Sequence, residues 1–228
     1  QIENNKKFFN KNKKLFDKIG IHNRRIVKKK ISSNDLALLS ARKIFKKIDK
    51  KKIDFLILCT QTGEFNIPTN ACILHNSLGL KKNSGAYDVN LGCSAYPYLL
   101  SLAKSIISSG QANHILLVTA DTYSKFISKE DLATRLIFSD GSTTSLISDK
   151  KTKNSFEILN FEFGTDGSGY KEFIIDRKKS NFIKMNGPKI YEFTLKVIPK
   201  TIIQFLKRKK ISKDQIDYFF FHQASKIV

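Results

Sequence analysis

Two residues of this chain have types and settings that could support nucleophilic chemistry, and the first is Cys93. The stretch DVNLGCSAYPYLL, residues 88–100, places this cysteine where an apolar extended run gives way to a helix. Unpaired N–H groups and the positive end of the helix dipole favour an anion there, and the thiolate is the nucleophilic form of cysteine. Free cysteine is also among the most buried residues, so position alone leaves inert packing as an open alternative.

The second residue is His222, in FFFHQAS, at the end of a predicted strand and just before a helix. In α/β folds, a strand end beside a helix start is where functional side chains are exposed. A hydrogen-bonded histidine at a buried edge is the alternative. Only the fold could bring His222 to Cys93, which lies 129 positions earlier. A cysteine nucleophile and a distant histidine are the parts that thiol acyl transfer requires.

The remaining cysteines and histidines have simpler explanations. Cys59 ends a predicted core strand and Cys72 lies inside an amphipathic helix, so packing accounts for both. His22, His75 and His114 are expected at the surface or at a core edge. Three scattered cysteines without a CxxC pair argue against a disulfide framework and a zinc site, and they favour a reducing cytoplasm.

The composition favours a globular, basic protein without a membrane span. The chain is 41% hydrophobic with 18 Phe, and no apolar run approaches the roughly 20 residues that span a bilayer. The formal net charge is +21, but the basic residues are spread along the chain, which argues against a dedicated nucleic-acid site. We interpret them as a solvated lysine-rich surface that would attract an acidic protein partner.

The elements that must position these residues alternate between helix and strand. Helices are predicted at residues 33–48, 68–79 and 93–109, and strands at residues 53–60, 86–91 and 114–121. Gly110 ends the third helix, and Pro97 is tolerated in its first turn. The first helix has an apolar face at helical spacing, made of Leu36, Leu39, Ile44 and Ile48.

The second half of the chain continues the alternation. Residues 139–149 read as a turn followed by a strand, and residues 156–167 continue the β pattern. A long helix begins near Pro188 with a possible kink at Pro199, and residues 217–223 read as a strand. Residues 1–14 are polar and are expected to form a helix or a loose arm. No Gly/Pro/Ser-rich linker divides the chain, so the pattern predicts one α/β domain.

Six segments, in order, resemble the β-ketoacyl-acyl-carrier-protein synthase III family of thiolase-like condensing enzymes. NLGCSAYPY and FFFHQAS resemble its nucleophile and histidine segments. The other four are GIHNRRI near the start, TQTGEFNIPTNACILHNSLGL, LIFSDGSTTSLI and MNGPKIYEF. Each segment alone is weak, and the shared order over nearly the whole chain carries the resemblance.

The resemblance implies a thiolase-like layered αβαβα sandwich, usually assembled as a homodimer. Residues 1–150 would be the N-terminal half with the nucleophile. Residues 151–228 would be the start of the C-terminal half, in a single domain that is incomplete at both ends. The family's third catalytic residue, an Asn, would lie beyond Val228. We therefore expect an internal fragment of a longer protein, with negligible condensing activity on its own.

By the same resemblance, Cys93 would accept an acyl group from a thioester, and its backbone N–H would contribute to an oxyanion hole. His222 would assist decarboxylation of malonyl-acyl-carrier protein, and the resulting enolate would attack the acyl group. This is an acyltransferase reaction of fatty-acid or specialised acyl-chain synthesis in the cytoplasm. It needs no cofactor besides acyl thioesters on coenzyme A or acyl carrier protein, and it involves no metal and no nucleic acid.

Substrate-binding positions follow from the resemblance as well. Lys18 and Arg24 fall where the family binds the donor, and Ile67 falls at the acyl-pocket wall, where a side chain smaller than Phe could admit a larger or branched acyl group. Lys14 and Leu132 stand where the family has an adenine-stacking Trp and its partner Arg. That change favours an acyl chain delivered by carrier protein.

Two alternatives stay open at this point. A thiolase-like acyltransferase could form an ester or an amide, or could carry out a hydroxymethylglutaryl-type condensation. A non-catalytic thiolase-like partner subunit would use its basic face for docking and would form no acyl adduct on Cys93.

Overall fold

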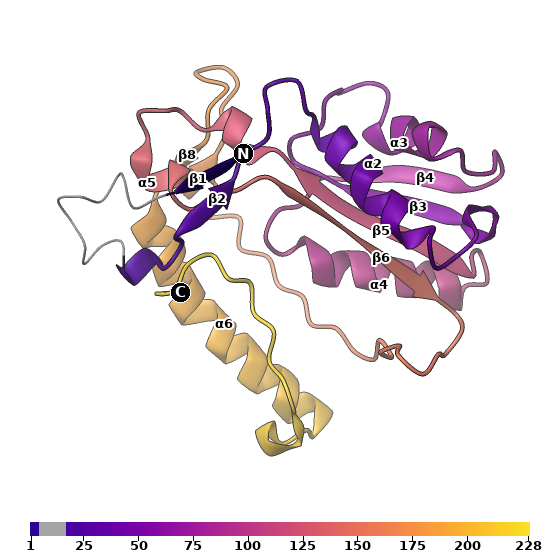
Figure 1. The fold of residues 1–228 in the computed structure, drawn as a ribbon. Helices are drawn as coiled ribbons and strands as arrows, with labels where there is room; N and C mark the ends of the chain where they lie inside the picture. The colour runs from indigo at the N-terminus through magenta and orange to yellow at the C-terminus, as the bar shows by residue number, and fades with distance from the viewer. Residues whose placement is uncertain (5–16) are drawn as a thin grey trace. The chain divides into compact units, whose positions relative to one another are not determined.

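The computed structural model describes residues 1–4 and 17–228 (Figure 1). By contacts, the chain divides into two compact units. Unit 1 comprises Gln1, Arg25–Lys125 and Ser139–Phe161, and unit 2 comprises Ile2–Arg24, Phe126–Phe138 and Glu162–Val228. The single domain with halves at 1–150 and 151–228 stays a prediction. Lys14 and most of the N-terminal segment expected as a helix or loose arm lie outside the described residues.

A four-stranded sheet forms the centre of unit 1. Its strands are β3 (Phe55–Cys59), β4 (Gly85–Val89), β5 (His114–Asp121) and β6 (Gly141–Ser148), in the order β4-β3-β5-β6. β4, β3 and β5 are parallel, and β6 is antiparallel to β5. In the register, Cys59 pairs with Val89 on one side and with Thr119 on the other. The carboxyl ends of β3, β4 and β5 therefore meet at one edge of the sheet.

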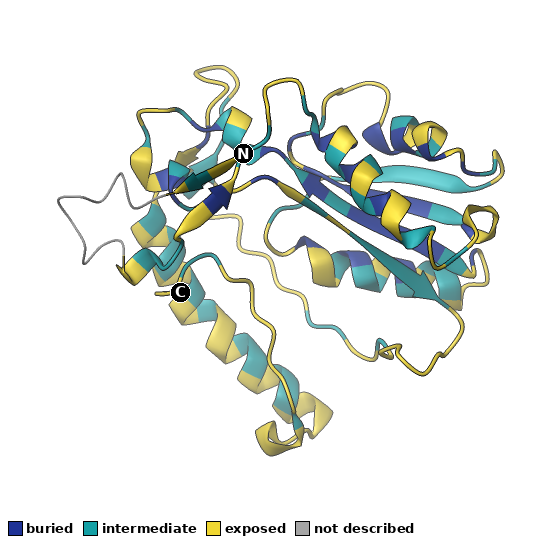
Figure 2. Ribbon diagram, viewed as in Figure 1, coloured by how far each residue is buried: buried dark blue, intermediate teal, exposed yellow. Residues whose placement is uncertain are grey.

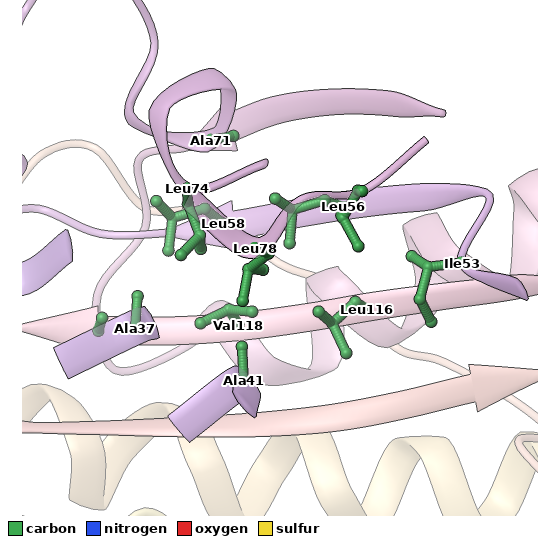
Figure 3. Packing of buried hydrophobic residues seen from close by; sticks show 12 residues of the cluster. Ala37, Ala41, Ile53, Leu56, Leu58, Ala71, Leu74, Leu78, Leu116 and Val118 are labelled. Carbon is green, nitrogen blue, oxygen red and sulfur yellow. The ribbon is translucent and has the colours of Figure 1, made fainter. Parts of the chain in front are cut away.

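Helices cover both faces of this sheet. α2 (Ser33–Ile44) and α3 (Asn70–Leu78) lie on one face, and α4 (Ala95–Ser108) lies on the other (Figure 1). Successive residues of a strand point to opposite faces. Leu56 and Leu58 of β3 accordingly pack toward α2 and α3, whereas Ile57 and Cys59 pack toward α4. Unit 1 thus has a three-layer αβα core, with its buried residues concentrated in β3 and β5 (Figures 2 and 3).

The predicted helix boundaries of unit 1 are confirmed to within a few residues. Ser32 caps α2 through a capping box with Asp35. Gly79 and Gly110 follow α3 and α4 with φ of 62° and 73°, the left-handed conformation that glycine adopts without strain. Pro97 is the third residue of α4, within the first turn, where a missing N–H breaks no helical hydrogen bond.

The predicted apolar residues Ile44 and Ile48 pack against the core, whereas Leu39 does not. Leu39 is 58% exposed, whereas Ala37 and Ala41 are fully buried against the sheet (Figure 3). Small side chains allow a helix backbone to approach a sheet closely, so the alanine stripe forms the contact. Leu39 lies outside this stripe and remains in solvent.

Unit 2 contains shorter strands and one long helix. β1 (Ile2–Asn4) pairs with β2 (Asn23–Arg25), and β7 (Phe173–Ile174) pairs with β8 (Lys184–Met185). The helices are α5 (Leu132–Arg135) and α6 (Gly187–Lys209). α6 begins near Pro188, as the sequence predicts, with Pro188 in its first turn and Pro199 inside it. The side chain of Asn186 caps the helix.

Two predicted β segments are not strands. Residues 156–167 and residues 217–223 contain no strand in the structure. Phe156 is 98% exposed and Phe220 is 92% exposed. An apolar run becomes a strand only when neighbouring backbones supply its hydrogen bonds, and neither segment pairs with a described strand.

Among the described residues, no helix combines the length and the apolar content needed to cross a membrane.

Candidate active site

Cys93 lies between β4 and α4, at the predicted strand-to-helix junction. It precedes the first residue of α4 by two positions, and it is exposed. Ser94 occupies the cap position without a side-chain hydrogen bond to the helix, and the Ala95 N–H donates to Gly92 O at 2.9 Å. The thiol therefore stands at the N-terminus of a 14-residue helix, on the edge where the parallel strands end.

The acidity of the Cys93 thiol differs from the expectation. Desolvation and the negative charge of Asp121 raise the pKa of Cys93, and the hydrogen bond from its own backbone N–H opposes them. Water reaches the residue, while protein atoms surround most of the sulfur and desolvate it. The free Cys93 is consequently a thiol at neutral pH and needs a base before it can attack.

Hydrogen bonds join the ends of β3 and β4 close to Cys93 in the sequence. The Thr60 N–H donates to Val89 O at 3.2 Å, which links the end of β3 to the end of β4. The Cys59 thiol donates to Leu91 O at 3.2 Å, two residues before Cys93. These bonds fix the backbone that leads into the nucleophile.

Asp121, the last residue of β5, accepts hydrogen bonds from the loop that follows β3. Its Oδ1 accepts from the Gln61 N–H at 2.8 Å, and from the Thr62 N–H and hydroxyl at 3.1 and 2.9 Å. The Thr60 hydroxyl donates to the same oxygen at 3.1 Å. Thr62 Oγ1 in turn accepts from the Thr122 N–H at 2.8 Å, so the two loops close into a ring of hydrogen bonds.

The side chains of Gln61 and Tyr123 lie against the glycine before the nucleophile. The Tyr123 hydroxyl donates to Gln61 Oε1 at 2.5 Å. A Cβ at Gly92 would come within 2.7 Å of Gln61 Oε1 and 3.7 Å of the Tyr123 hydroxyl oxygen. A side chain at position 92 would therefore displace the end of the Gln61 side chain from its present place. Desolvation, followed by the charge of Asp121, raises the pKa of Tyr123, which keeps the phenol protonated.

Sequence reasoning did not identify Asp121, Gln61 or Tyr123 as part of this edge. The signal for Asp121 is its position at the end of the buried strand HILLVTAD. Gln61 likewise follows a buried strand, IDFLILC. For Tyr123 no sequence signal exists, because its proximity to Gly92 depends on the turn after β5.

The other two cysteines fall in different environments. Cys59 is buried, as predicted, and desolvation raises the pKa of its thiol. Cys72 is exposed, so the prediction of a packing role for it is wrong; its Sγ accepts from the Thr69 hydroxyl at 3.0 Å. The apolar stripe of α3 is carried instead by Leu74 and Leu78. Among the described residues, no group of three or more His, Cys, Asp and Glu could hold a metal ion.

Ile67 lies on the loop between β3 and α3 and is 89% exposed. Asn70 shapes this loop, since its Oδ1 accepts from the N–H groups of Glu64 and Phe65 at 3.0 and 3.2 Å. Asp88 anchors the base of the loop by accepting from the Asn70 N–H at 2.7 Å and the Ala71 N–H at 2.6 Å. Within unit 1, the side chain of Ile67 is therefore exposed to solvent, and its role at an acyl-pocket wall stays a prediction.

His222 belongs to unit 2 and is exposed in an extended segment. The preceding Phe219 and Phe221 stack with centroids 6.0 Å apart, and the Lys226 N–H donates to Ile19 O at 2.9 Å. Desolvation lowers the pKa of His222, so the imidazole is neutral at pH 7.

The two predicted donor-binding residues differ in accessibility. Lys18 is exposed and lines a shallow depression of unit 2 together with Lys226. Arg24 is 1% exposed; it pairs with Glu3 and donates to Phe138 O at 3.3 Å. Burial in an ion pair argues against the predicted contact of Arg24 with a donor phosphate, because the guanidinium already stabilises the β1–β2 region.

Comparison with known proteins gives consistent matches. The family profile of 3-oxoacyl-[acyl-carrier-protein] synthase III matches residues 87–167, which include Cys93. A curated relative, the β-ketoacyl-[acyl-carrier-protein] synthase III of Oceanobacillus iheyensis, is 30% identical over 208 residues; the match covers 90% of this chain and 65% of the relative. The chain thus spans less than two thirds of the length of that relative.

Solved structures agree over nearly the whole chain. A crystal structure of a 3-oxoacyl-(acyl-carrier-protein) synthase III is 34% identical with a TM-score of 0.90, covering 99% of this chain and 75% of that one. The 3-oxoacyl-(acyl-carrier protein) synthase of Burkholderia xenovorans LB400 is 29% identical with a TM-score of 0.85, covering 100% and 71%.

The sheet order, the cysteine at the β4–α4 junction and these structural matches define a thiolase-like α/β fold, which confirms the predicted fold class. More narrowly, the chain belongs to the 3-oxoacyl-(acyl-carrier-protein) synthase III family. The family inferred from the ordered sequence segments is therefore confirmed.

Proposed function

We propose that this chain carries the nucleophile of a condensing acyltransferase, and that Cys93 is that nucleophile. The observation that carries the proposal is the exposed thiol at the N-terminus of α4, on the sheet edge where three parallel strands end. Ligands of open α/β sheets bind at the carboxyl ends of the strands. The names of the related proteins point to acyl-carrier-protein thioesters as the substrate class.

The proposed reaction has two stages. The sulfur of Cys93 attacks the carbonyl carbon of an acyl thioester, the donor leaves as a free thiol, and an acyl-cysteine forms. Malonyl-acyl-carrier protein then loses carbon dioxide, and its enolate carbon attacks the acyl carbonyl. The thiol of Cys93 is regenerated and a β-ketoacyl thioester leaves. The Cys93 backbone N–H, which bonds toward its own sulfur, is suited to stabilise the oxyanion of each tetrahedral intermediate.

His222 is proposed to act in the second stage. Its lowered pKa supports this role, because a neutral imidazole can donate one N–H to an enolate oxygen without carrying a charge. The same neutral form can accept the proton of the Cys93 thiol, whose raised pKa requires a base.

Donor binding and partners extend the proposal. Lys18, exposed beside Lys226, is suited to contact a donor phosphate. The last turn of α6 carries Lys207, Arg208 and Lys209, and such a basic surface favours an acidic carrier protein. Three free cysteines fit a reducing cytoplasm. Ile67 would line an acyl pocket only if another surface covered its loop, which supports a homodimer.

Intact-mass analysis of the full-length protein tests the proposed nucleophile. Incubation with an acyl thioester should add the mass of one acyl group, and peptide mapping should place it on Cys93. The Cys93→Ala variant should show no adduct, whereas the exposed-cysteine control Cys72→Ala should be acylated like the wild type. A wild-type protein without an adduct would overturn the proposal and favour a non-catalytic subunit. Release of carbon dioxide from malonyl-acyl-carrier protein separates condensation from ester or amide formation.

A further inference from the structure

The carboxylate of Asp121 is the charged group at this sheet edge that acts on the Cys93 thiol. All four of its hydrogen bonds fall on one oxygen, Oδ1, and all come from the loop after β3. An ionised carboxylate offers about four acceptor sites on its two oxygens, so four donors on one oxygen mark that atom as the point on which the loop converges. The loop at residues 60–62 is thus built around Asp121.

Gln61 connects Asp121 to the backbone next to Cys93. The bond from the Gln61 N–H fixes the backbone of that residue, and its side-chain Oε1 then stands 2.7 Å from where a Cβ of Gly92 would be. Tyr123 lies two residues after Asp121, and its hydroxyl donates a hydrogen bond to the same Gln61 Oε1 at 2.5 Å. The loop after β3 therefore packs against the backbone at Gly92, the residue before Cys93.

We propose that Asp121 is a positioning residue for the nucleophile. Its Oδ1 accepts hydrogen bonds from residues 60–62 and thereby holds the side chains of Gln61 and Tyr123 in contact with Gly92. This contact fixes the backbone of Cys93. This inference rests on the proposed role of Cys93. It adds a residue that acts through the loop and makes no contact with the reacting carbonyl.

The charge of Asp121 makes the Cys93 thiol less acidic. Its negative charge contributes to the raised pKa of Cys93, of Cys59 and of Tyr123, the titratable groups that surround it on β3, on η3 (Tyr123–Phe126) and before α4. Because its charge disfavours the thiolate of Cys93, we explain the presence of Asp121 by its positioning of residues 60–62. Geometry and charge can be separated because asparagine keeps the accepting oxygen and removes the charge.

The test compares Asp121→Asn and Asp121→Ala in the full-length protein, with Asp54→Asn and Asp54→Ala as matched controls. Asp54 likewise joins neighbouring strand ends, at the opposite edge of the sheet: its Oδ2 accepts from the N–H groups of Asn113 and His114 at 2.9 and 3.0 Å, and Lys81 pairs with its Oδ1 at 2.6 Å. Its loss should affect folding without reaching Cys93. Two quantities are measured on each variant, the pH profile of Cys93 alkylation by iodoacetamide and the rate of acylation by a thioester.

We expect Asp121→Asn to move the alkylation profile of Cys93 to lower pH and to retain most of the acylation rate. Asp121→Ala, which also loses the accepting oxygen, should slow acylation by roughly tenfold or more, because small displacements of a reacting group have large effects on rate. The Asp54 variants should change neither quantity. Gln61→Ala removes the contact with Gly92 directly. Its effect on the acylation rate should therefore not add to that of Asp121→Ala.

Acylation of Asp121→Ala at the wild-type rate would overturn the proposal, as would equal effects of the Asp121 and Asp54 variants. If Asp121→Ala does not fold, Gln61→Ala decides, because acylation at the wild-type rate in that variant would show that the contact between Gln61 and Gly92 does not position Cys93. Failure of the proposed function is distinguishable, because it would abolish acylation of the wild type and leave the alkylation profiles measurable.

Discussion

At the scale of single residues, Cys93 combines an exposed position with a poorly acidic thiol. The helix N-terminus favours the thiolate, whereas desolvation and Asp121 disfavour it, and the net direction is a raised pKa. The same argument separates Cys93 from Cys59. Both thiols have raised pKa values, but Cys59 is buried and donates to Leu91 O. Accessibility, and not acidity, therefore distinguishes the candidate nucleophile.

The rate of Cys93 alkylation by iodoacetamide should rise with pH, with a midpoint above the value of about 8.5 for an ordinary thiol. The sign follows because a raised pKa keeps the sulfur protonated at pH 7 to 8, where a free thiol is already partly ionised. Quantitative peptide mass spectrometry across pH 6 to 10.5, roughly the range in which thiols titrate, measures it. N-acetylcysteine amide serves as the reference, and a Cys93 midpoint below that of the reference would contradict the prediction.

At the scale of elements, the sheet and its helices owe their arrangement to alternating side chains. Leu56 and Leu116 are fully buried on the face covered by α2 and α3, where alanines of α2 meet the sheet (Figure 3). This face holds β3 in the centre of the sheet, and β3 leads directly into residues 60–62. Packing of the core thereby fixes the origin of the loop that contacts Gly92.

Leu56→Ala should lower the free energy of unfolding by ~2–5 kcal/mol, because it leaves a cavity in a closely packed core. Leu39→Ala is the matched control on α2. Its side chain is 58% exposed, so its effect should stay within ~0.5 kcal/mol. Urea denaturation followed by circular dichroism measures both variants. Similar losses for the two would mean that the sequence-predicted apolar face, with Leu39 buried, is the right one.

At the scale of the whole molecule, β4 leaves one edge of the described four-stranded sheet unpaired. The Gly85 N–H donates to Asp54 O, and Val89 O accepts from the Thr60 N–H, so these residues turn their backbone groups toward β3. By alternation, Ala86 and Asp88 direct their backbone groups away from the sheet. An exposed edge of this kind favours pairing with a second copy.

The full-length protein should therefore have twice the mass of one chain in multi-angle light scattering. Ala86→Pro should shift it toward the monomer, since proline removes an outward N–H without removing a bond to β3. Ala86→Gly, which keeps that N–H, should remain dimeric. A dimer insensitive to Ala86→Pro would show that another surface holds the two copies together.

The sequence by itself determined the local elements and the family. Periodicity and end signals located β3, β5, α3, α4 and α6, since strand alternation and helix caps are encoded within a few neighbouring residues. The position of Cys93 at a strand-to-helix junction followed from the same local signals. The ordered segments around Cys93 and His222 then carried the family resemblance, which the comparisons confirm.

Tertiary structure alone decided what surrounds each side chain. The burial of Arg24, the exposure of Leu39 and Cys72, and the absence of strands at residues 156–167 and 217–223 all depend on which neighbours are present. The thiol of Cys93 is the clearest case. Its helix-end position is local and predicts greater acidity, whereas the desolvation and the charge of Asp121 that reverse the direction come from packing between strands distant in sequence. Local patterns specify conformation, but electrostatic environment is a property of the assembled sheet.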